Sequence, residues 1–303
     1  MANLILIFVC LIIGAILHRL GKLPHSTSAV LNSFVVNIAL PAIVLLHVHE
    51  MAITRRALYP AGMAWIVFIG CGIIIILLGR WLKWSRGTIG ALLLTACLGN
   101  TSFVGFPLLE ALYGPSSLEA GVLADQAGSF FVLSTLGLFA AAIFSSKEIS
   151  AKVVARRIFT FAPFLATVVA LCLRPICYPP AFISILDRIG STLVPVALVS
   201  IGYQLNFKAA TLGKYRLELG IGWCLKLIVA PLLILLIYVV FIGARGEWIQ
   251  VTITEAAMAP MITGAIIAEE YGLEPELSNL MVGIGIPISL VTVPIWAHLL
   301  RWV

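Results

Sequence analysis

The sequence predicts an all-α integral membrane protein of ten transmembrane helices, arranged as two inverted five-helix repeats with broken crossing helices in the fourth and ninth spans. Hydrophobic residues fill 61% of the 303 positions and charged residues only 11%, whereas about a quarter of the residues in soluble domains are charged. Apolar runs long enough to cross a bilayer recur along the chain. They lack the alternation of a β-barrel, so we expect helices.

Turn residues and charges separate the apolar runs, and each run is expected to form one span. The first run has no basic region before it and no small-residue cleavage site, so we interpret it as a span rather than a signal peptide. Residues 1–145 and 158–303 form the two repeats, joined by a short cytoplasmic linker at 146–157. The expected spans are 2–17, 26–47, 57–79, 88–112, 120–144, 158–175, 182–203, 217–243, 248–270 and 278–300.

Several function classes are disfavoured by composition and motifs. The six cysteines show neither CxxC nor histidine-paired spacing, and the five histidines lie at span ends, so no metal site is expected. No catalytic or nucleotide-binding motif occurs in a usable context, so we expect neither an enzyme nor a cofactor. The net charge of +6 comes from residues between spans rather than from a basic face, so no nucleic-acid partner is expected.

Basic residues in the loops predict the orientation. One side is richer in them, so the positive-inside rule places that side in the cytoplasm and both termini outside, in a multi-pass protein of the cell (inner) membrane. The richer side holds Arg19, Lys22, Arg80, Lys83, Arg86, Lys147, Lys152, Arg156, Arg157, Lys208, Lys214 and Arg216. The opposite side holds Arg55, Arg56, Arg174, Arg245 and Arg301.

Three short matches between the halves indicate an internal repeat. They occur in the same order and are separated by nearly the same number of residues. Five spans in each repeat is an odd number, so the halves must insert in opposite orientations, which is typical of secondary transporters. The matches pair Leu40–Val44 with Val194–Leu198, Glu110–Gly114 with Glu269–Gly272, and Val132–Leu136 with Ser289–Val293.

The fourth and ninth spans are interrupted at corresponding places, by Gly99–Pro107 and around Pro260. Proline removes an amide donor and breaks or bends a helix. Freed backbone groups at membrane depth are tolerated where they line a wet cavity, and half-helix N-termini favour anions. Simple kinks are the alternative reading. The substrate-binding candidates at the breaks are Asn100, Thr101, Ser102, Gly105, Pro107, Pro260 and Thr263.

Ionisable residues inside spans are candidates for ion coupling. Asp125, beside Gln126, is either a proton or cation site or a solvated residue near the outer mouth. Glu255 either titrates or binds a cation, or lies at the interface. Lys226 either neutralises carbonyls or a carboxylate at the crossing, standing in for a metal ion, or snorkels to the cytoplasmic face.

Taken in order, several short motifs make the chain resemble the auxin efflux carrier family, with the short central loop of its bacterial, malate/malonate permease-like branch. The resemblance covers essentially the whole chain and adds Asn37 to the substrate-binding candidates. The second break has no Asn beside Pro260. The motifs are Asn37–Pro41, Gly99–Pro107 with Leu108–Gly114, Pro195 with Ile201, Gly202 and Leu205, Lys226 with Pro231 and Leu232, and Pro260 with Tyr271 and Gly272.

The resemblance implies a secondary active transporter of a small organic anion, a mono- or dicarboxylate that is auxin-like or malate/malonate-like. It implies a scaffold domain of the first, second, sixth and seventh spans beside a transport domain with the crossing helices, and a possible homodimer. Since no nucleotide-binding motif exists, a gradient of H⁺ or Na⁺ must drive alternating access. A passive channel or ligand-sensing protein on the same scaffold is the alternative, and a membrane enzyme is a third class.

Overall fold

The computed structural model describes residues 2–24, 26–50, 54–145, 151–204 and 212–303. Every regular element in these ranges is a helix, and the one β-type contact is an isolated bridge between two non-helical segments. The expected all-helical fold is therefore confirmed.

The first half consists of helical stretches, one of which is broken between Ala96 and Thr101. Several stretches contain π-helical turns, which often occur at functional sites. The α-helices are α1 (Ala2–Leu20), α2 (Thr27–Phe34), α3 (Leu40–Glu50), α4 (Leu58–Trp81), α5 (Arg86–Ala96), α6 (Phe106–Tyr113), α7 (Leu118–Leu123) and α8 (Leu138–Ser145). The π-helical turns are η1 (Val35–Ala39), η3 (Thr101–Gly105), η5 (Ala124–Phe130) and η6 (Leu133–Gly137), and η2 (Arg55–Ala57) and η4 (Pro115–Ser117) are 3₁₀ turns.

The second half begins within the expected linker, where α9 (Ala151–Phe159) is helical. Residues 146–150, with Lys147, lie outside the described residues, as does Lys208. The helices that follow are α10 (Ala162–Leu173), α11 (Pro180–Gly190), α12 (Leu193–Gln204), α14 (Arg216–Cys224), α15 (Ala230–Leu235), α16 (Glu247–Ala256), α17 (Ile262–Glu270) and α18 (Pro275–Leu299). The turns η7 (Leu225–Val229) and η8 (Leu236–Phe241) are π-helical, and η9 (Leu300–Trp302) is 3₁₀.

Six helical stretches in the described ranges are long and apolar enough to cross a membrane, so the chain is a multi-pass membrane protein. The apolar parts of α1 and α10 are shorter. The fourth and ninth expected spans are each divided into two short helices, α5 with α6 and α16 with α17. The six stretches are Thr27–His49, Arg55–Trp81, Pro115–Ser145, Pro180–Tyr203, Arg216–Phe241 and Pro275–Trp302.

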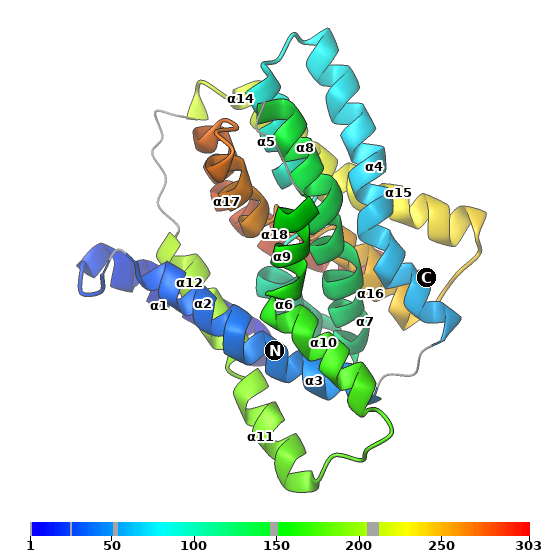
Figure 1. The fold of residues 1–303 in the computed structure, drawn as a ribbon. Helices are drawn as coiled ribbons and strands as arrows, with labels where there is room; N and C mark the ends of the chain where they lie inside the picture. The colour runs from blue at the N-terminus through cyan, green and yellow to red at the C-terminus, as the bar shows by residue number, and fades with distance from the viewer. Residues whose placement is uncertain (1, 25, 51–53, 146–150, 205–211) are drawn as a thin grey trace.

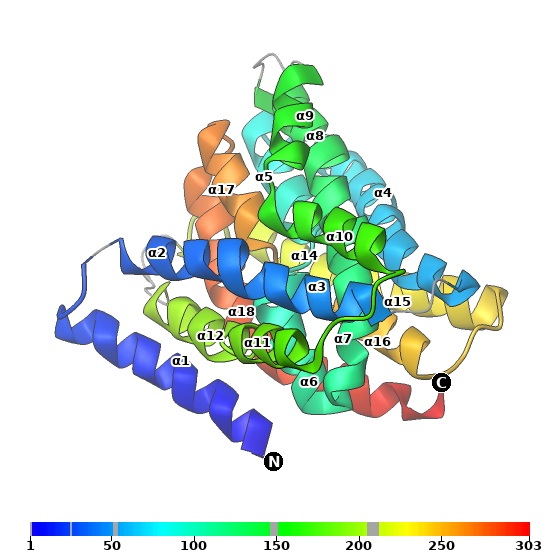
Figure 2. The same ribbon diagram turned by 60° about the horizontal axis from the view of Figure 1, so that its bottom comes forward.

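The helices pack in two groups. In Figures 1 and 2, α1, α2, α3, α11 and α12 lie together on one side of the molecule, and α4, α5, α8, α14 and α17 lie on the other. Within the first group α1 runs along α12 and α11 packs on α3, and α10 joins this group because it also packs on α3. The α1–α12 contact depends on Gly14 and Gly202, because a methyl group on either would collide with the other helix's backbone. Small residues allow this close approach in membrane helices.

The second group has its own apolar core, in which α5 is buried along its length between α17, α18 and α8. Gly264 of α17 lies against the backbone carbonyl of Leu94 in α5, with no room for a side chain between them. The two broken stretches are therefore held together by direct backbone contact.

Candidate functional site

The two helix breaks meet and pair through their backbones. The amide of Asn100 donates to the carbonyl of Ala259 at 2.8 Å, and the amide of Met261 donates to the carbonyl of Leu98 at 3.2 Å. These bonds form an antiparallel bridge between Gly99 and Pro260. Backbone groups that a proline-containing break would leave unpaired in a membrane are thus satisfied by the other break.

The first break supplies its own N-terminal cap. The Oδ1 of Asn100 accepts hydrogen bonds from the amides of Phe103 and Val104, at 3.1 and 3.4 Å. Asn100 is 2% exposed, and its Nδ2 has no hydrogen-bond partner among the described residues. Pro107 is the second residue of α6, which continues directly from η3, and a proline has no amide to leave unpaired there. The free amides expected at this break are therefore largely occupied.

At the second break, the carbonyl end of the first half-helix has a side-chain partner, and the amide end of the second half-helix has no side-chain cap. The first half-helix, α16, ends at Ala256, and α17 begins at Ile262 without a side-chain cap. Pro260 packs against Gly285 of α18, where a methyl group would lie 2.6 Å from the proline Cδ. The first amides of α17 thus keep the partial positive charge of a helix N-terminus.

Lys226 joins the two breaks from η7. Its side chain is 1% exposed, and its Nζ donates to the carbonyl of Ala256 at 2.6 Å. A methyl group on Gly99 would lie 3.1 Å from the same Nζ. The ammonium therefore neutralises the C-terminal end of α16, where a cation is favoured. The snorkelling alternative does not fit this burial.

Glu255 is fully buried one residue before the end of α16. Neither carboxylate oxygen has a hydrogen-bond partner within the part of the chain that the structure describes. Its carboxylate lies against two glycines: methyl groups on Gly105 and Gly121 would lie 2.9 and 3.4 Å from its nearest oxygen. An unpaired buried carboxylate is costly in its charged form. Glu255 is therefore expected either to carry a proton or to depend on a nearby cation.

Asp125 lies in η5 and is 3% exposed, which does not fit a solvated position. It accepts hydrogen bonds from Thr101 Oγ1 at 2.6 Å and from Gln126 Nε2 at 2.7 Å. Through Thr101, the first residue of η3, this carboxylate lies at the N-terminal end of the first break. Gln126 Oε1 is buried and has no partner among the described residues.

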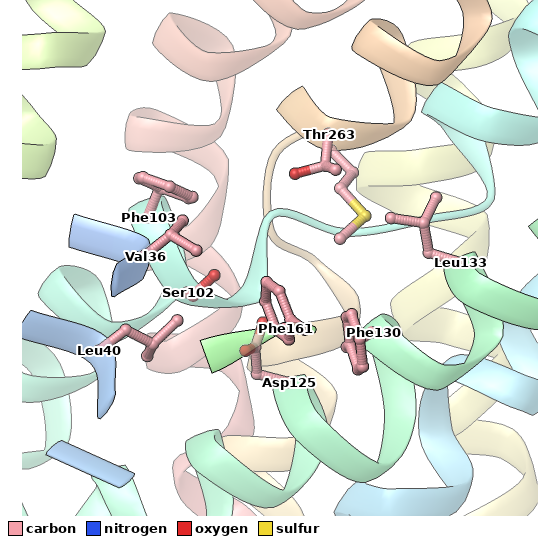
Figure 3. Close-up of a pocket in the computed structure, with 10 residues that line it drawn as sticks. Val36, Leu40, Ser102, Phe103, Asp125, Phe130, Leu133, Phe161 and Thr263 are labelled. Carbon is pink, nitrogen blue, oxygen red and sulfur yellow. The ribbon is translucent and has the colours of Figure 1, made fainter. Parts of the chain in front are cut away.

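A cavity of about 70 Å³ lies beside the crossing (Figure 3). Its polar lining comes from both breaks and from η5, in the form of Ser102, Thr263 and Asp125. Figure 3 shows all three around the same space. The remaining lining residues are Val36, Leu40, Phe103, Phe130, Leu133, Phe161 and Met261.

The structure separates the sequence candidates into distinct places. Ser102, Asp125 and Thr263 line the cavity, whereas Asn37 is exposed, and its Nδ2 donates to the Ser33 carbonyl at 2.9 Å. Candidates from four different stretches lie in π-helical turns, which widen the helix locally and re-aim side chains. These are Asn37 in η1, Thr101, Ser102 and Gly105 in η3, Asp125 and Gln126 in η5, and Lys226 in η7.

Sequence reasoning missed the aromatic wall of the cavity. Phe130 and Phe161 stack with ring centroids 4.0 Å apart, and both line the cavity. No pattern in the sequence distinguishes them, since phenylalanine is common throughout the apolar runs. Tyr113 was also missed; its hydroxyl and that of Thr254 form a 2.8 Å hydrogen bond between α6 and α16.

The crossing brings together groups that can bind a small polar solute. In the described ranges the buried charged side chains are Asp125, Lys226 and Glu255. No group of three His, Cys, Asp or Glu side chains comes together there as metal ligands. A small solute in the cavity would contact hydroxyls, a carboxylate and a helix N-terminus at once.

Comparison with known proteins gives matches along nearly the whole chain. A family model described as "Membrane transport protein" matches residues 1–297. An uncharacterized transporter of Methanothermobacter thermautotrophicus is 26% identical over 298 residues, covering 97% of this chain and 96% of the relative. The uncharacterized transporter YfdV of Escherichia coli K12 is 24% identical over 322 residues, covering 99% and 98%. A second uncharacterized transporter, from Methanocaldococcus jannaschii, is 24% identical over 310 residues, covering 98% and 97%.

Proposed function

Because the chain belongs to the auxin efflux carrier family of membrane transport proteins, we propose that it is a secondary active transporter of a small organic anion. The anion, a mono- or dicarboxylate, binds at the crossing of the fourth and ninth spans and crosses by gradient-driven alternating access. This family is one of transporters and not of enzymes.

The observation that carries the proposal is the paired crossing with a polar cavity at its side. Transporters with inverted repeats bind their solutes where broken helices meet near the middle of the membrane. Here two breaks pair at Gly99 and Pro260. The cavity beside them collects Ser102 and Thr263, one from each break. The open N-terminus of α17 supports an anionic solute.

We further propose ten spans in two inverted halves. The six long stretches, the shorter α1 and α10, and the two divided stretches together would supply them. Reciprocal packing supports the inverted repeat. The first span (α1) contacts the seventh (α12), and the sixth span (α10) contacts the second (α3), so the first helix of each half packs on the second helix of the other half. The scaffold group of α1, α2, α3, α10, α11 and α12 would then hold still while the crossing moves.

Charge balance supports coupling to a cation. Two carboxylates and one ammonium are buried near the crossing, so the site carries one excess negative charge if all three are ionised. An incoming anion increases that excess in a region of low dielectric constant. A co-transported H⁺ or Na⁺ would offset it, and Glu255, without a hydrogen-bond partner in the described residues, is the group we propose to receive a proton.

Transport by purified protein in proteoliposomes tests the proposal. Labelled malate, malonate, lactate and indole-3-acetate are offered under an imposed pH or Na⁺ gradient, with protein-free liposomes as control. We expect counterflow of at least one carboxylate and accumulation that collapses when an ionophore dissipates the driving gradient. Counterflow absent for every carboxylate would contradict the proposal, and a conductance far above carrier turnover would indicate a channel.

The proposed orientation places both termini outside the cytoplasm. It rests on the basic loops, and Figure 1 shows the α4–α5 turn and the start of α14 at the same end of the molecule. Cys177 is exposed beyond the end of α10, near Arg174, on the side expected to face outward. A membrane-impermeant thiol reagent should label it in intact cells, and labelling only after permeabilisation would reverse the assignment. A homodimer is also proposed, and native mass spectrometry tests it.

A further inference from the structure

The cavity beside the crossing has an uneven charge pattern. Asp125 is the one charged side chain among the described residues that line it, and no lysine, arginine or histidine lines it. The cation nearest the crossing, Lys226, is already hydrogen-bonded to the Ala256 carbonyl and does not line the cavity. A solute that presented only negative charge would therefore meet a carboxylate of the same sign without a compensating side chain.

The two helix N-termini at the crossing are not equally open to an anion. At the first break, Asn100 Oδ1 accepts from the amides of Phe103 and Val104, and the Asp125 carboxylate accepts from Thr101. At the second break, α17 has no side-chain cap, and Thr263 in its first turn lines the cavity. The cavity is thus negative on the Asp125 side and positive on the Thr263 side. Figure 3 shows these two side chains on opposite sides of the space.

The cavity is also small. Its volume is about 70 Å³, which is room for a few groups of the size of a water molecule. Pockets for drug-sized ligands measure about 300–1,000 Å³. Apolar side chains, including the stacked pair Phe130 and Phe161, line the remainder. This size and lining suit a short carbon skeleton with polar groups at its two ends.

We propose that the solute is a short organic anion that carries a hydrogen-bond donor, a hydroxyl or an ammonium, close to its carboxylate group. The donor group binds Asp125, and the carboxylate points to Thr263 and the N-terminus of α17. This inference rests on the proposed function and narrows its substrate class to small hydroxy or amino acids. Asp125 then acts as a specificity residue, since a solute without a donor leaves the buried Asp125 carboxylate against an apolar group.

Matched solute pairs test the inference in wild-type proteoliposomes. Lactate is compared with propionate, and glycolate with acetate, because each pair differs by one hydroxyl; alanine supplies the ammonium form, and malonate adds a carboxylate without a donor. We expect the donor-bearing member to be transported at least about tenfold faster at equal low concentration, as expected for a hydrogen bond to a charged group. Alanine against lactate shows which donor is used.

The outcomes separate this inference from the proposed function. If propionate, acetate or malonate is transported as fast as lactate or glycolate, the inference fails while the transport of an organic anion stands. If no carboxylate is transported under any gradient, both fail. A clear preference within both pairs supports both.

Asp125→Asn gives an independent test. Asparagine keeps an acceptor for Thr101, and a flip of the Gln126 amide would let its unpartnered Oε1 accept from the new Nδ2. We expect the ratio of the lactate transport rate to the propionate transport rate to fall to about one, because the lactate hydroxyl loses its charged acceptor and propionate has no hydroxyl to lose one. Ser134→Ala, which removes a buried hydroxyl outside the cavity, should keep the wild-type ratio. An unchanged ratio in the Asp125 variant would overturn the inference, and if that variant does not fold, the wild-type pairs decide.

Discussion

The two helix breaks occupy equivalent places in the chain and satisfy their backbones by different means. The first is closed by its own residues, since Asn100 caps the helix that follows and Asp125 binds Thr101. The second depends on Lys226 for its carbonyl end, and its amide end has no side-chain cap. Two breaks of the same kind thus leave different backbone groups available: the amides after the first break are capped by a side chain, and those at the start of α17 are not.

Removing the cation of the second break is expected to have the largest effect. Lys226→Met keeps the length of the side chain but leaves the Ala256 carbonyl and two buried carboxylates without the ammonium. Loss of one member of a buried charge set costs about 3–5 kcal/mol. We expect a lower thermal unfolding temperature in detergent and no measurable transport. Lys214→Met changes an exposed lysine in the same way and should leave both unchanged. Wild-type stability in the Lys226 variant would show that the second break does not need a cation.

Gly105 at the first break and Gly264 at the second should respond differently to substitution by alanine. In Gly264→Ala the new methyl group meets the backbone carbonyl of Leu94, which cannot move aside, so we expect a loss of about 1–3 kcal/mol in the free energy of unfolding. In Gly105→Ala it meets the carboxylate of Glu255, a side chain that can turn away, so a smaller loss is expected.

Thermal unfolding of the purified variants compares them. Gly220→Ala is the control, because nothing lies within 4 Å of its added methyl group. If Gly105→Ala lost more unfolding free energy than Gly264→Ala, the expected order of the two substitutions would be wrong.

Loss of the cap should weaken the first break moderately. Asn100→Ala removes the acceptor of two amides and should cost about 1 kcal/mol, with the protein still inserted and folded but impaired in transport. Ser85→Ala is a matched control, because Ser85 caps α5 through the Thr88 amide away from the crossing. Both variants should lose similar stability, and only the Asn100 variant should lose transport. Equal transport in the two would mean that the first break has a structural role alone.

The smallest expected change is in solute affinity. Thr263→Val removes one hydroxyl from the cavity at the open N-terminus of α17 and should weaken apparent affinity by about tenfold or less, without a loss of stability. Thr95→Val, which removes a buried hydroxyl bonded to the Ala91 carbonyl, should leave affinity unchanged. Concentration dependence of uptake measures both. If Thr263→Val keeps the wild-type apparent affinity for the solute, the Thr263 hydroxyl at the second break does not contact the solute.

The sequence predicted the helical fold and the positions of both breaks, because proline and glycine act through local backbone geometry. It also marked Asp125, Lys226 and Glu255, since charged residues stand out in apolar runs. In the structure all three are buried inside the helix bundle near the crossing, where charged residues of membrane spans are usually found.

The difference between the breaks could not be predicted. Whether an N-terminus is capped depends on the angle at which the chain enters the helix, and Asn100 and Thr263 both looked like polar residues at a break. The bond from Lys226 to Ala256 joins residues from separate spans, and the Phe130–Phe161 stack brings together rings from the fifth and sixth expected spans. Such contacts are set by tertiary packing, which short-range patterns do not encode.

The backbone bridge between Gly99 and Pro260 has a consequence for hydrogen–deuterium exchange. The amides of Asn100 and Met261 lie outside helices, yet each donates to the opposite break. If the crossing moves as one piece, both amides stay bonded throughout the transport cycle and should exchange as slowly as amides in the middle of α5. Fast exchange at these two positions, with slow exchange in α5, would mean that the two breaks separate during each cycle. The deuterium uptake of two amides thus reports whether the moving part is one body or two.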